Sequence, residues 1–333
     1  MNEPKISVII PLFNAEKYIR ECLISVLAST FQYYEVLVVD DCSTDNSVAE
    51  VKKLLPYFDG RLKIFSTGKN SGGPGVPRNI GIKNSSGKYI TFIDNDDLIL
   101  PNALEIFFET ADAFGAEVIH TEKCFLFNKE FRRDNLMTYN LGMKEKFVSE
   151  PTFEPEDLNF RMHQLTHENF TCMPWGKFFR RDFLIENKIE FPQMQYGEDF
   201  VFCFKCLCLA KKYLVVPYVT NTHRFGISSA ANVKFSKAQD GVRLWIRILL
   251  KQLAVIDEFM SGHEFFVANH AAHRDVLKFC AEHNFHIIKD FLKTVPPHEL
   301  QKIFFDELKN PALDVNGKNI LTAYLCTEKF LVG

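Results

Sequence analysis

Long hydrophobic runs are missing from this sequence of 333 residues. No stretch reaches the roughly 18 apolar residues that a membrane-spanning helix needs, and the most apolar late segment, 244–259, still contains Arg247, Lys251 and Asp257. The apolar run at 6–12 lacks the length and the flanks of a signal peptide. We therefore expect a cytoplasmic protein, with peripheral contact at the inner face of the cell membrane as the alternative.

An excess of positive charge and a cysteine framework are absent as well. The 39 Lys+Arg and 42 Asp+Glu residues give a formal net charge of −3, which argues against nucleic acid as a partner. The nine cysteines show no spacing typical of secreted disulfide proteins. Cys203, Cys206 and Cys208 lie in an apolar stretch without a second pair at zinc spacing, so we expect them to pack in the core.

The first 115 residues alternate between strand-like and helix-like segments. The β-rich apolar runs are 6–10, 35–40, 62–65 and 89–94. The segments with helical periodicity, or with helix-start signals, are 15–28, 48–57, 78–84 and 101–114. This order predicts a mostly parallel sheet covered on both faces, in which ligands bind beyond the carboxyl ends of the strands.

After residue 115 the pattern is less regular. We expect a strand at 118–120, a charged surface excursion at 129–155, and a second short strand at 214–216. Helical patterns cover 175–185 and 199–211. From 236 onward nearly everything is helix-like, and no repeat or low-complexity linker marks a sharp boundary, so a domain boundary is expected near 230.

Acidic side chains gather where two of the buried strands end. The cluster Asp94-Asn95-Asp96-Asp97 follows a strand and precedes a proline-led helix. Carboxylates two residues apart at a strand end suit Mg²⁺ or Mn²⁺ shared with phosphate oxygens, and a solvated turn with helix caps is the alternative. Asp40 and Asp41 end another strand, where they can accept hydrogen bonds from a nucleoside.

A glycine-rich loop, 70–79, precedes the third helix-like segment. It contains neither a Walker pattern nor G-x-G-x-x-G. Its glycines permit close approach of backbone to a ligand, and Arg78 near a helix start favours anions. Taken alone, such a loop is more often structural than functional.

The order of these motifs is more specific than any one of them. The chain carries Pro-Leu-Phe-Asn at 11–14, Val-Val-Asp-Asp at 38–41, an Asn-to-Arg-Asn stretch at 70–79 and Phe-Ile-Asp-Asn-Asp-Asp at 92–97. This order resembles the family 2 glycosyltransferases of the GT-A fold. The resemblance is strong over residues 5–110 and thinner to about 230.

The resemblance implies an α/β fold, with a Rossmann-like and mostly parallel sheet, helices on both faces and a helical C-terminal extension. Residues 1–115 would bind the nucleotide sugar, 116–230 would form the acceptor-side half of the domain, and 231–333 the extension. It also implies an inverting transfer from a nucleotide diphosphate sugar, expected to be a UDP-sugar. The acceptor would be a saccharide or lipid-linked saccharide, as in the synthesis of bacterial surface polysaccharides.

The resemblance also assigns residues to the donor. Those that it places around the nucleotide and sugar are Pro11, Phe13, Asn14, Asp40, Asp41, Asn70, Arg78, Asp94, Asn95, Arg224 and Ser228. Asp41 would face the base, and Asn70 and Arg78 would close over nucleoside and sugar. Asp94 and Asp96 would hold Mn²⁺ or Mg²⁺, with His223 completing the shell. Pro77 departs from the family, which usually has Ala before Arg-Asn.

Glu198 and Asp199 open the helix-like segment after Gly197. Inversion at an anomeric carbon needs a base on the face opposite the leaving group, and a carboxylate there can deprotonate the acceptor hydroxyl. By resemblance Asp199 is that base and Glu198 its neighbour. The alternative is two acids that merely stabilise a first helical turn. Trp175 would stack on a sugar or anchor a helix.

A non-catalytic subunit of a polysaccharide assembly complex, binding sugar nucleotide or acting as a scaffold, is the rival interpretation. The intact acidic motifs argue against it. Whether the protein is an enzyme or a subunit, the helices expected after residue 236 offer a surface for a partner. Their apolar residues Trp245, Ile248 and Leu249 recur at helical spacing and so share one face, with Arg243 and Arg247 nearby. Packing on the catalytic domain, a homodimer and an interfacial helix on anionic lipid all remain open.

Overall fold

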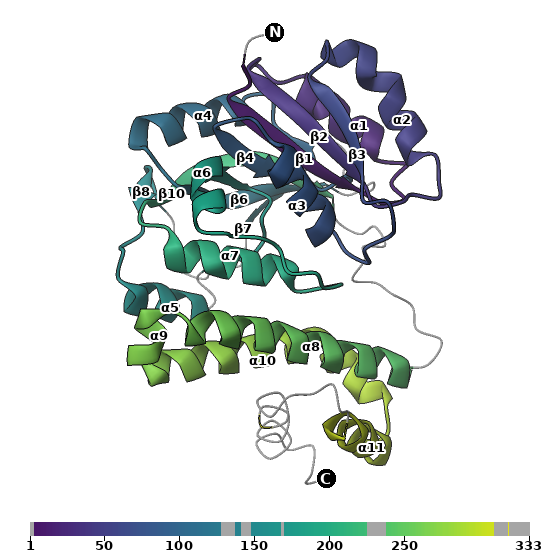
Figure 1. Cartoon of the computed structure of the whole chain (residues 1–333), viewed down its shortest axis with the longest axis vertical. Coiled ribbons are helices and arrows are strands. Elements are labelled where there is room, and N and C mark those ends of the chain that lie inside the picture. Colours follow the sequence, from purple (N-terminus) through teal and green to yellow (C-terminus); the bar gives the residue numbers. More distant parts are fainter. Residues whose placement is uncertain are drawn as a thin grey trace. The chain divides into compact units, whose positions relative to one another are not determined.

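The computed structural model describes residues 3–127, 137–140, 148–167, 170–224, 238–309 and 319. The chain divides into two compact units, Met1–Ile227 and Ser228–Gly333. Figure 1 shows a sheet with covering helices in the first unit and helices alone in the second.

The first unit is built on one sheet with the strand order β3-β2-β1-β4-β9-β6-β10-β5, to which β7 and β8 add at β6 and β10. The strands are β1 Ile6–Leu12, β2 Tyr34–Asp40, β3 Leu62–Ser66, β4 Tyr89–Phe92, β5 Leu98–Ile99, β6 Val118–Phe127, β7 Met137–Asn140, β8 Thr152–Phe153, β9 Lys177–Arg180 and β10 Tyr213–Arg224. The pairs β1–β2, β2–β3, β1–β4 and β6–β10 are parallel. The α/β class predicted from the sequence is confirmed, but the sheet as a whole is mixed, because the pairs β4–β9, β6–β9, β6–β7, β5–β10 and β8–β10 are antiparallel.

Helices cover both faces of this sheet (Figure 1). They are α1 Ile19–Leu27, α2 Ser47–Leu54, η1 Leu55–Phe58, α3 Gly75–Asn84, α4 Ala103–Phe114, α5 Leu158–Thr166, α6 Arg181–Glu186 and α7 Glu198–Leu209. Ile6, Val8 and Ile10 of β1 pack in one core with α1, α2 and α4. Ile9 points to the other face, toward Gly81 of α3. Burial on both faces explains why the central strands are apolar without alternation.

The helix predicted over 175–185 is wrong in its first half. Residues 177–180 form β9, which lies antiparallel between β4 and β6, and the helix starts only at Arg181. Phe178 stacks on Tyr89 on one side of the sheet, while Phe179 packs against Phe92 on the other. Four residues are too few for a period of two to be visible in the sequence. The predicted burial of Cys203, Cys206 and Cys208 as free thiols is confirmed.

The second unit consists of helices: α8 Ala238–Ser261, α9 Glu264–Ala268, α10 His270–Thr294 and α11 Pro297–Leu308. Trp245, Ile248 and Leu249 of the apolar stripe are buried. Arg243 and Arg247 form ion pairs with Asp306 and Glu307 of α11. The stripe and two of its neighbouring cations are thus engaged within the protein, which favours packing over contact with lipid. Within the described residues no helix is both long and apolar enough to cross a membrane.

Glu35 connects three strands at the amino edge of the sheet. Its buried carboxylate accepts hydrogen bonds from Ser7 of β1 and from Ser86 before β4, and it pairs with Lys63 of β3 at 2.9 Å. Burial alone would raise the pKa of Glu35, but these partners outweigh it and hold the pKa below its usual value. The ionised carboxylate is therefore the form that stabilises the fold.

We predict that Glu35→Gln lowers the free energy of unfolding at pH 7 by about 1–3 kcal/mol, because hydrogen bonds to a charged group are lost. Since the folded-state pKa is lowered, this stabilisation is present above the ordinary carboxyl pKa and disappears as pH falls through the folded-state value. Urea unfolding at pH 7 and in acid measures it. The exposed Glu109→Gln serves as control, and an equal loss at both pH values would contradict the prediction.

Candidate active site

The carboxyl ends of β1, β2 and β4 bring together most of the residues predicted to bind the donor. Asn14 has a φ of 47° and accepts hydrogen bonds through its side chain from Thr44. Asn95 donates to the carbonyl oxygen of Pro11 at 2.9 Å. Asp40 accepts from the backbone N–H of Ser43. The predicted convergence of these strand ends is therefore present, and the ring of Phe13 at the same edge is 46% exposed.

Asp41 organises the loop that follows β3. Its buried carboxylate accepts hydrogen bonds from both the backbone N–H and the hydroxyl of Ser71, and from the hydroxyl of Thr67. Asn70 donates to the Asp41 carbonyl at 3.0 Å. Asp41 and Asn70 thus lie together, as predicted. The sequence analysis missed Thr67 and Ser71, because a hydroxyl in a loop carries no periodic signal.

Arg78 joins the strand-end acids to the acids of α7. Its Nη2 lies 2.9 Å from Asp94, and its Nη1 lies 2.5 Å from Asp199 and 3.5 Å from Glu198. The guanidinium also lies over the ring of Phe191, 5.2 Å from its centroid. This differs from the expected position of Arg78 over a nucleoside, because the residue is only 1% exposed. Asp94, just after the end of β4, and Asp199, at the start of α7, therefore both pair with the same guanidinium.

Glu198 and Asp199 form a coupled pair of carboxyl groups. Burial, followed by the charge of Asp199, raises the pKa of Glu198 well above its usual value. Burial also raises the pKa of Asp199, against the opposing charge of Arg78 and the hydrogen bond that Glu198 donates. Two neighbouring carboxyl groups favour a state in which only one of them is ionised. The hydrogen bond from Glu198 and the ion pair with Arg78 both favour the ionised form of Asp199, so the shared proton is favoured on Glu198.

A second corner of the site contains Asp96, Asp97 and His223. Burial and the charges of Asp97 and Asp94 raise the pKa of Asp96 to about 7. Asp97 is buried and accepts hydrogen bonds from His223 Nδ1 at 3.0 Å and from the backbone N–H of Arg224. Burial alone would lower the pKa of His223, but Asp97 raises it. Because Nδ1 is engaged by Asp97, Nε2 is the ring nitrogen that remains for a ligand.

The described residues contain no cluster of three or more His, Cys, Asp or Glu side chains arranged to hold a metal. Asp96 and His223 nevertheless fit a cation that takes its other ligands from a diphosphate, which is how Mg²⁺ is usually bound. Within the described parts of the chain, no Lys or Arg side chain forms an ion pair with the Asp96 carboxylate. Asp97 holds His223 in the way that an outer carboxylate holds a metal-binding histidine.

Arg224 was predicted to contact the donor, and the structure gives it protein partners. It pairs with Glu21 at 2.6 Å, donates to the Asp96 carbonyl and lies over the ring of Tyr18. These contacts fix the backbone of the acidic turn. Ser228, the last residue predicted to contact the donor, lies outside the described residues.

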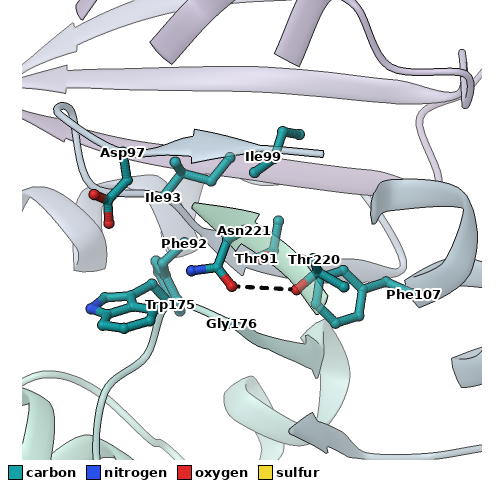
Figure 2. Close-up of a pocket in the computed structure, with 10 residues that line it drawn as sticks. All are labelled: Thr91, Phe92, Ile93, Asp97, Ile99, Phe107, Trp175, Gly176, Thr220 and Asn221. Carbon is teal, nitrogen blue, oxygen red and sulfur yellow. Dashed lines mark hydrogen bonds between the residues drawn. The ribbon is translucent and has the colours of Figure 1, made fainter. Parts of the chain in front are cut away.

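Trp175 packs against the same corner. Its ring stacks on His223 with 5.0 Å between centroids and 7° between planes. Figure 2 shows Trp175 and Asp97 at one end of a small cavity and Phe107 at the other. The cavity has room for about one water molecule. Trp175 is therefore buried in this part of the site, but it precedes β9 and anchors no helix.

The role of Asp97 was not predicted from the sequence, where a solvated turn with helix caps was only the alternative for the acidic cluster as a whole. The available signal was the third acid of the Asp94-Asn95-Asp96-Asp97 cluster, since two acids already satisfy the metal pattern. Its partner His223 lies 126 residues further along the chain. A contact at that separation is visible only in the fold.

The fold and the site together define a class of protein. Residues 7–187 match the sequence profile described as Glycosyl transferase family 2, and the chain belongs to this family.

The relatives of this chain include bacterial glycosyltransferases. It is 34% identical over 216 residues to the poly(ribitol-phosphate) beta-glucosyltransferase of Bacillus spizizenii, covering 63% of this chain and 31% of that protein. It is 34% identical over 220 residues to the poly(ribitol-phosphate) beta-N-acetylglucosaminyltransferase TarS of Staphylococcus aureus, covering 64% and 34%. The match thus spans about a third of the length of these relatives. The uncharacterized glycosyltransferase YibD of Escherichia coli is 30% identical over 235 residues, covering 67% and 65%.

The crystal structure of S. aureus TarS 1-349 has the same fold. It aligns with a TM-score of 0.60 and 22% identity, covering 97% of this chain and 92% of that one. A complex of TarS 1-349 with UDP-GlcNAc aligns with a TM-score of 0.57. The GT-A fold expected from the sequence is therefore confirmed.

We predict that Glu198→Gln raises the melting temperature relative to wild type by an amount that grows from about pH 5 to about pH 9. In wild type the carboxyl ionises at its ordinary pKa in the unfolded chain but stays protonated in the folded protein, so the stability that a raised folded-state pKa confers is lost as pH rises through this range. Glutamine does not ionise and has no such loss, so the two proteins should differ little only below the ordinary carboxyl pKa. Thermal unfolding across this range measures the effect. A loss of several kcal/mol at pH 7 would show instead that Glu198 is ionised.

Proposed function

We propose that this chain transfers a sugar from a UDP-sugar to a hydroxyl group, with inversion at the anomeric carbon. The observation that carries the proposal is the single guanidinium that binds both Asp94, at the donor edge, and Asp199, at the start of α7. Both carboxylates have side chains that are 30% exposed. The donor and the acceptor hydroxyl would therefore meet at one opening.

The names of the relatives suggest which donor and acceptor this chain uses. Two of them glycosylate poly(ribitol-phosphate), and TarS has been crystallised with UDP-GlcNAc. We infer that UDP-glucose or UDP-GlcNAc is the donor and that a polyol-phosphate polymer is the acceptor. A lipid-linked saccharide, the acceptor expected from the sequence, is the competing substrate in the same assay.

Asp199 would act as the general base. As the acceptor oxygen forms its bond to the anomeric carbon, the bond from that carbon to the phosphate oxygen breaks and the hydroxyl proton passes to Asp199. Burial raises the pKa of Asp199, and the charge of Arg78 opposes this shift and favours the ionised carboxylate, since loss of that charge would leave the buried guanidinium less well paired. Glu198 orients the base through the proton that it shares.

Asp96 and the Nε2 atom of His223 would hold Mn²⁺ or Mg²⁺, with Asp94 beside them. The cation, when bound, supplies charge that stabilises the departing diphosphate. Asp97 positions His223 for this purpose, and Arg224 fixes the turn that carries Asp96. The raised pKa of Asp96 supports the assignment, because a cation relieves repulsion among neighbouring carboxylates.

Asp41, Asn14 and Phe13 would bind the nucleoside. The Asp41 carboxylate holds Ser71, so this residue shapes the loop beside the base-binding position as well as offering hydrogen-bond acceptors. Phe13 offers an exposed aromatic face for the nucleobase.

We predict that Asp199→Asn reduces the transfer rate at saturating substrate by about 10²–10⁴-fold, the usual contribution of a positioned base. Donor affinity should stay close to wild type, because the nucleoside side of the site is untouched. Release of UDP with acceptor present measures transfer, and calorimetric titration with UDP measures affinity. Wild-type transfer by Asp199→Asn would remove this residue as the base.

Two variants serve as controls for this test. Asp41→Ala should show the opposite pattern, with weaker UDP binding and a smaller effect on the saturated rate. Glu198→Gln should be milder than Asp199→Asn. If Glu198→Gln is inactive while Asp199→Asn transfers normally, the two acids exchange roles.

We predict that EDTA abolishes transfer and that Mn²⁺ restores it. Asp96→Asn should weaken Mn²⁺ binding in the presence of UDP, because one of the few protein ligands is lost. Titration of free Mn²⁺ by electron paramagnetic resonance measures this independently of activity. Asp182→Asn, on an exposed side chain, is the matched control. Full activity in EDTA would leave the acids as ligands of the sugar or ribose.

A further inference from the structure

Gly73, before α3, and Gly75, the first residue of α3, both lie close to backbone atoms of another segment. A Cβ atom on Gly73 would lie 2.7 Å from the carbonyl oxygen of Met194, and one on Gly75 would lie 3.1 Å from that of Pro192. Real Cβ atoms do not approach so closely as the first of these contacts. The glycines therefore permit close packing against residues 191–195, the segment that leads into α7 and Asp199.

Asn79 binds the same segment. Its side-chain N–H donates to the carbonyl oxygen of Phe191 at 2.8 Å, and its side-chain oxygen accepts from the N–H of Phe191 at 2.9 Å. Both backbone groups of Phe191 are thus satisfied by one asparagine. The Phe191 ring stacks face to face on Phe202 of α7, with 3.9 Å between centroids. Asn79 thus holds the backbone of Phe191 by two hydrogen bonds, and the Phe191 ring in turn packs on α7.

Arg78 completes these contacts. Its guanidinium is nearly inaccessible at 1% exposure, whereas its partners Asp94 and Asp199 are each 30% exposed. A ligand can therefore reach both carboxylates without reaching the arginine between them. The planar guanidinium binds one carboxylate at each end, so it fixes the distance between them.

We propose that residues 73–79, here called the base platform, position Asp199 against the donor edge of the sheet. Arg78 is in this view a positioning residue and not a contact for nucleoside or sugar. The proposal rests on the proposed function, in which Asp199 receives the acceptor proton. Displacement of a reacting group by about 1 Å can reduce a rate by about 10²-fold. Loss of the platform contacts should therefore lower the rate of sugar transfer.

Asn79→Ala is the primary test, because it changes no charge and removes only the contacts to Phe191. We expect the transfer rate at saturating UDP-GlcNAc or UDP-glucose, whichever the enzyme uses, to fall by about 10–100-fold. The dissociation constant for UDP should stay within about twofold, since a positioning effect on the base leaves donor binding unchanged. Lys83→Ala, an exposed residue of the same helix, is the matched control and should change neither quantity.

Arg78→Lys is the second test. A lysine keeps the positive charge but cannot bind two carboxylates at fixed separation. We expect a rate loss of at least the same size, again without weaker binding of UDP. Asn79→Asp keeps an acceptor for the Phe191 N–H but places a second carboxylate oxygen against the Phe191 carbonyl oxygen, so it should reduce the rate at least as much as Asn79→Ala. If circular dichroism shows that Arg78→Lys does not fold, Asn79→Ala alone decides the proposal.

Three results would overturn the proposal. Tenfold weaker UDP binding with an unchanged saturated rate in Arg78→Lys would make Arg78 a donor contact. Unchanged rate and affinity in Asn79→Ala and Asn79→Asp would show that the contacts to Phe191 do not position the base. Weaker UDP binding in Asn79→Ala would assign the platform to the donor. Failure of the proposed function is separate, because normal transfer by Asp199→Asn would reject the base itself.

Discussion

Arg78 carries a permanent positive charge at a position almost closed to solvent, and such a charge is tolerated only when it is paired. Its partners come from different parts of the chain: Asp94 follows β4, 16 residues after Arg78, whereas Glu198 and Asp199 start α7, 120 and 121 residues after Arg78. Neither half of the domain can satisfy the guanidinium or its carboxylates alone. The strand-end acid and the helix-start acid are therefore fixed relative to each other by electrostatic necessity.

Asp96 and Asp97 add negative charge close to Asp94. Among the described residues, the cations near these carboxylates do not balance that charge. Asp97 is buried and Asp96 is half-buried beside Asp94, and the imidazole of His223 and the backbone N–H of Arg224 engage the Asp97 carboxylate. Crowded and desolvated carboxylates destabilise a fold, and they persist where a function requires them. The cost is reduced because the raised pKa of Glu198 favours its uncharged form and because the turn that carries Asp96 is bound by Arg224.

Sequence reasoning predicted the strands and most helices of the first 115 residues, because strands buried on both faces are continuous apolar runs. It also brought Asn14, Asp41 and Asn95 to one edge, since parallel strands align their carboxyl ends. It could not find the partners of Arg78 or the role of Asp97, which depend on contacts between distant segments. The strand β9 was not predicted because four residues are too few to show strand periodicity in the sequence. It is recognised only by its pairing with β4 and β6.

That short strand has a consequence for folding. β9 fills the gap between β4 and β6, so residues 89–91 have no neighbour on that side until residues 178–180 arrive. During synthesis β4 is therefore an unprotected sheet edge for nearly ninety residues, or about 5–20 s at ordinary rates of translation. Such an edge pairs readily with other chains. A fragment ending near residue 115 would retain the motifs that we propose bind the nucleoside, but it would leave this edge of β4 permanently unpaired and prone to association.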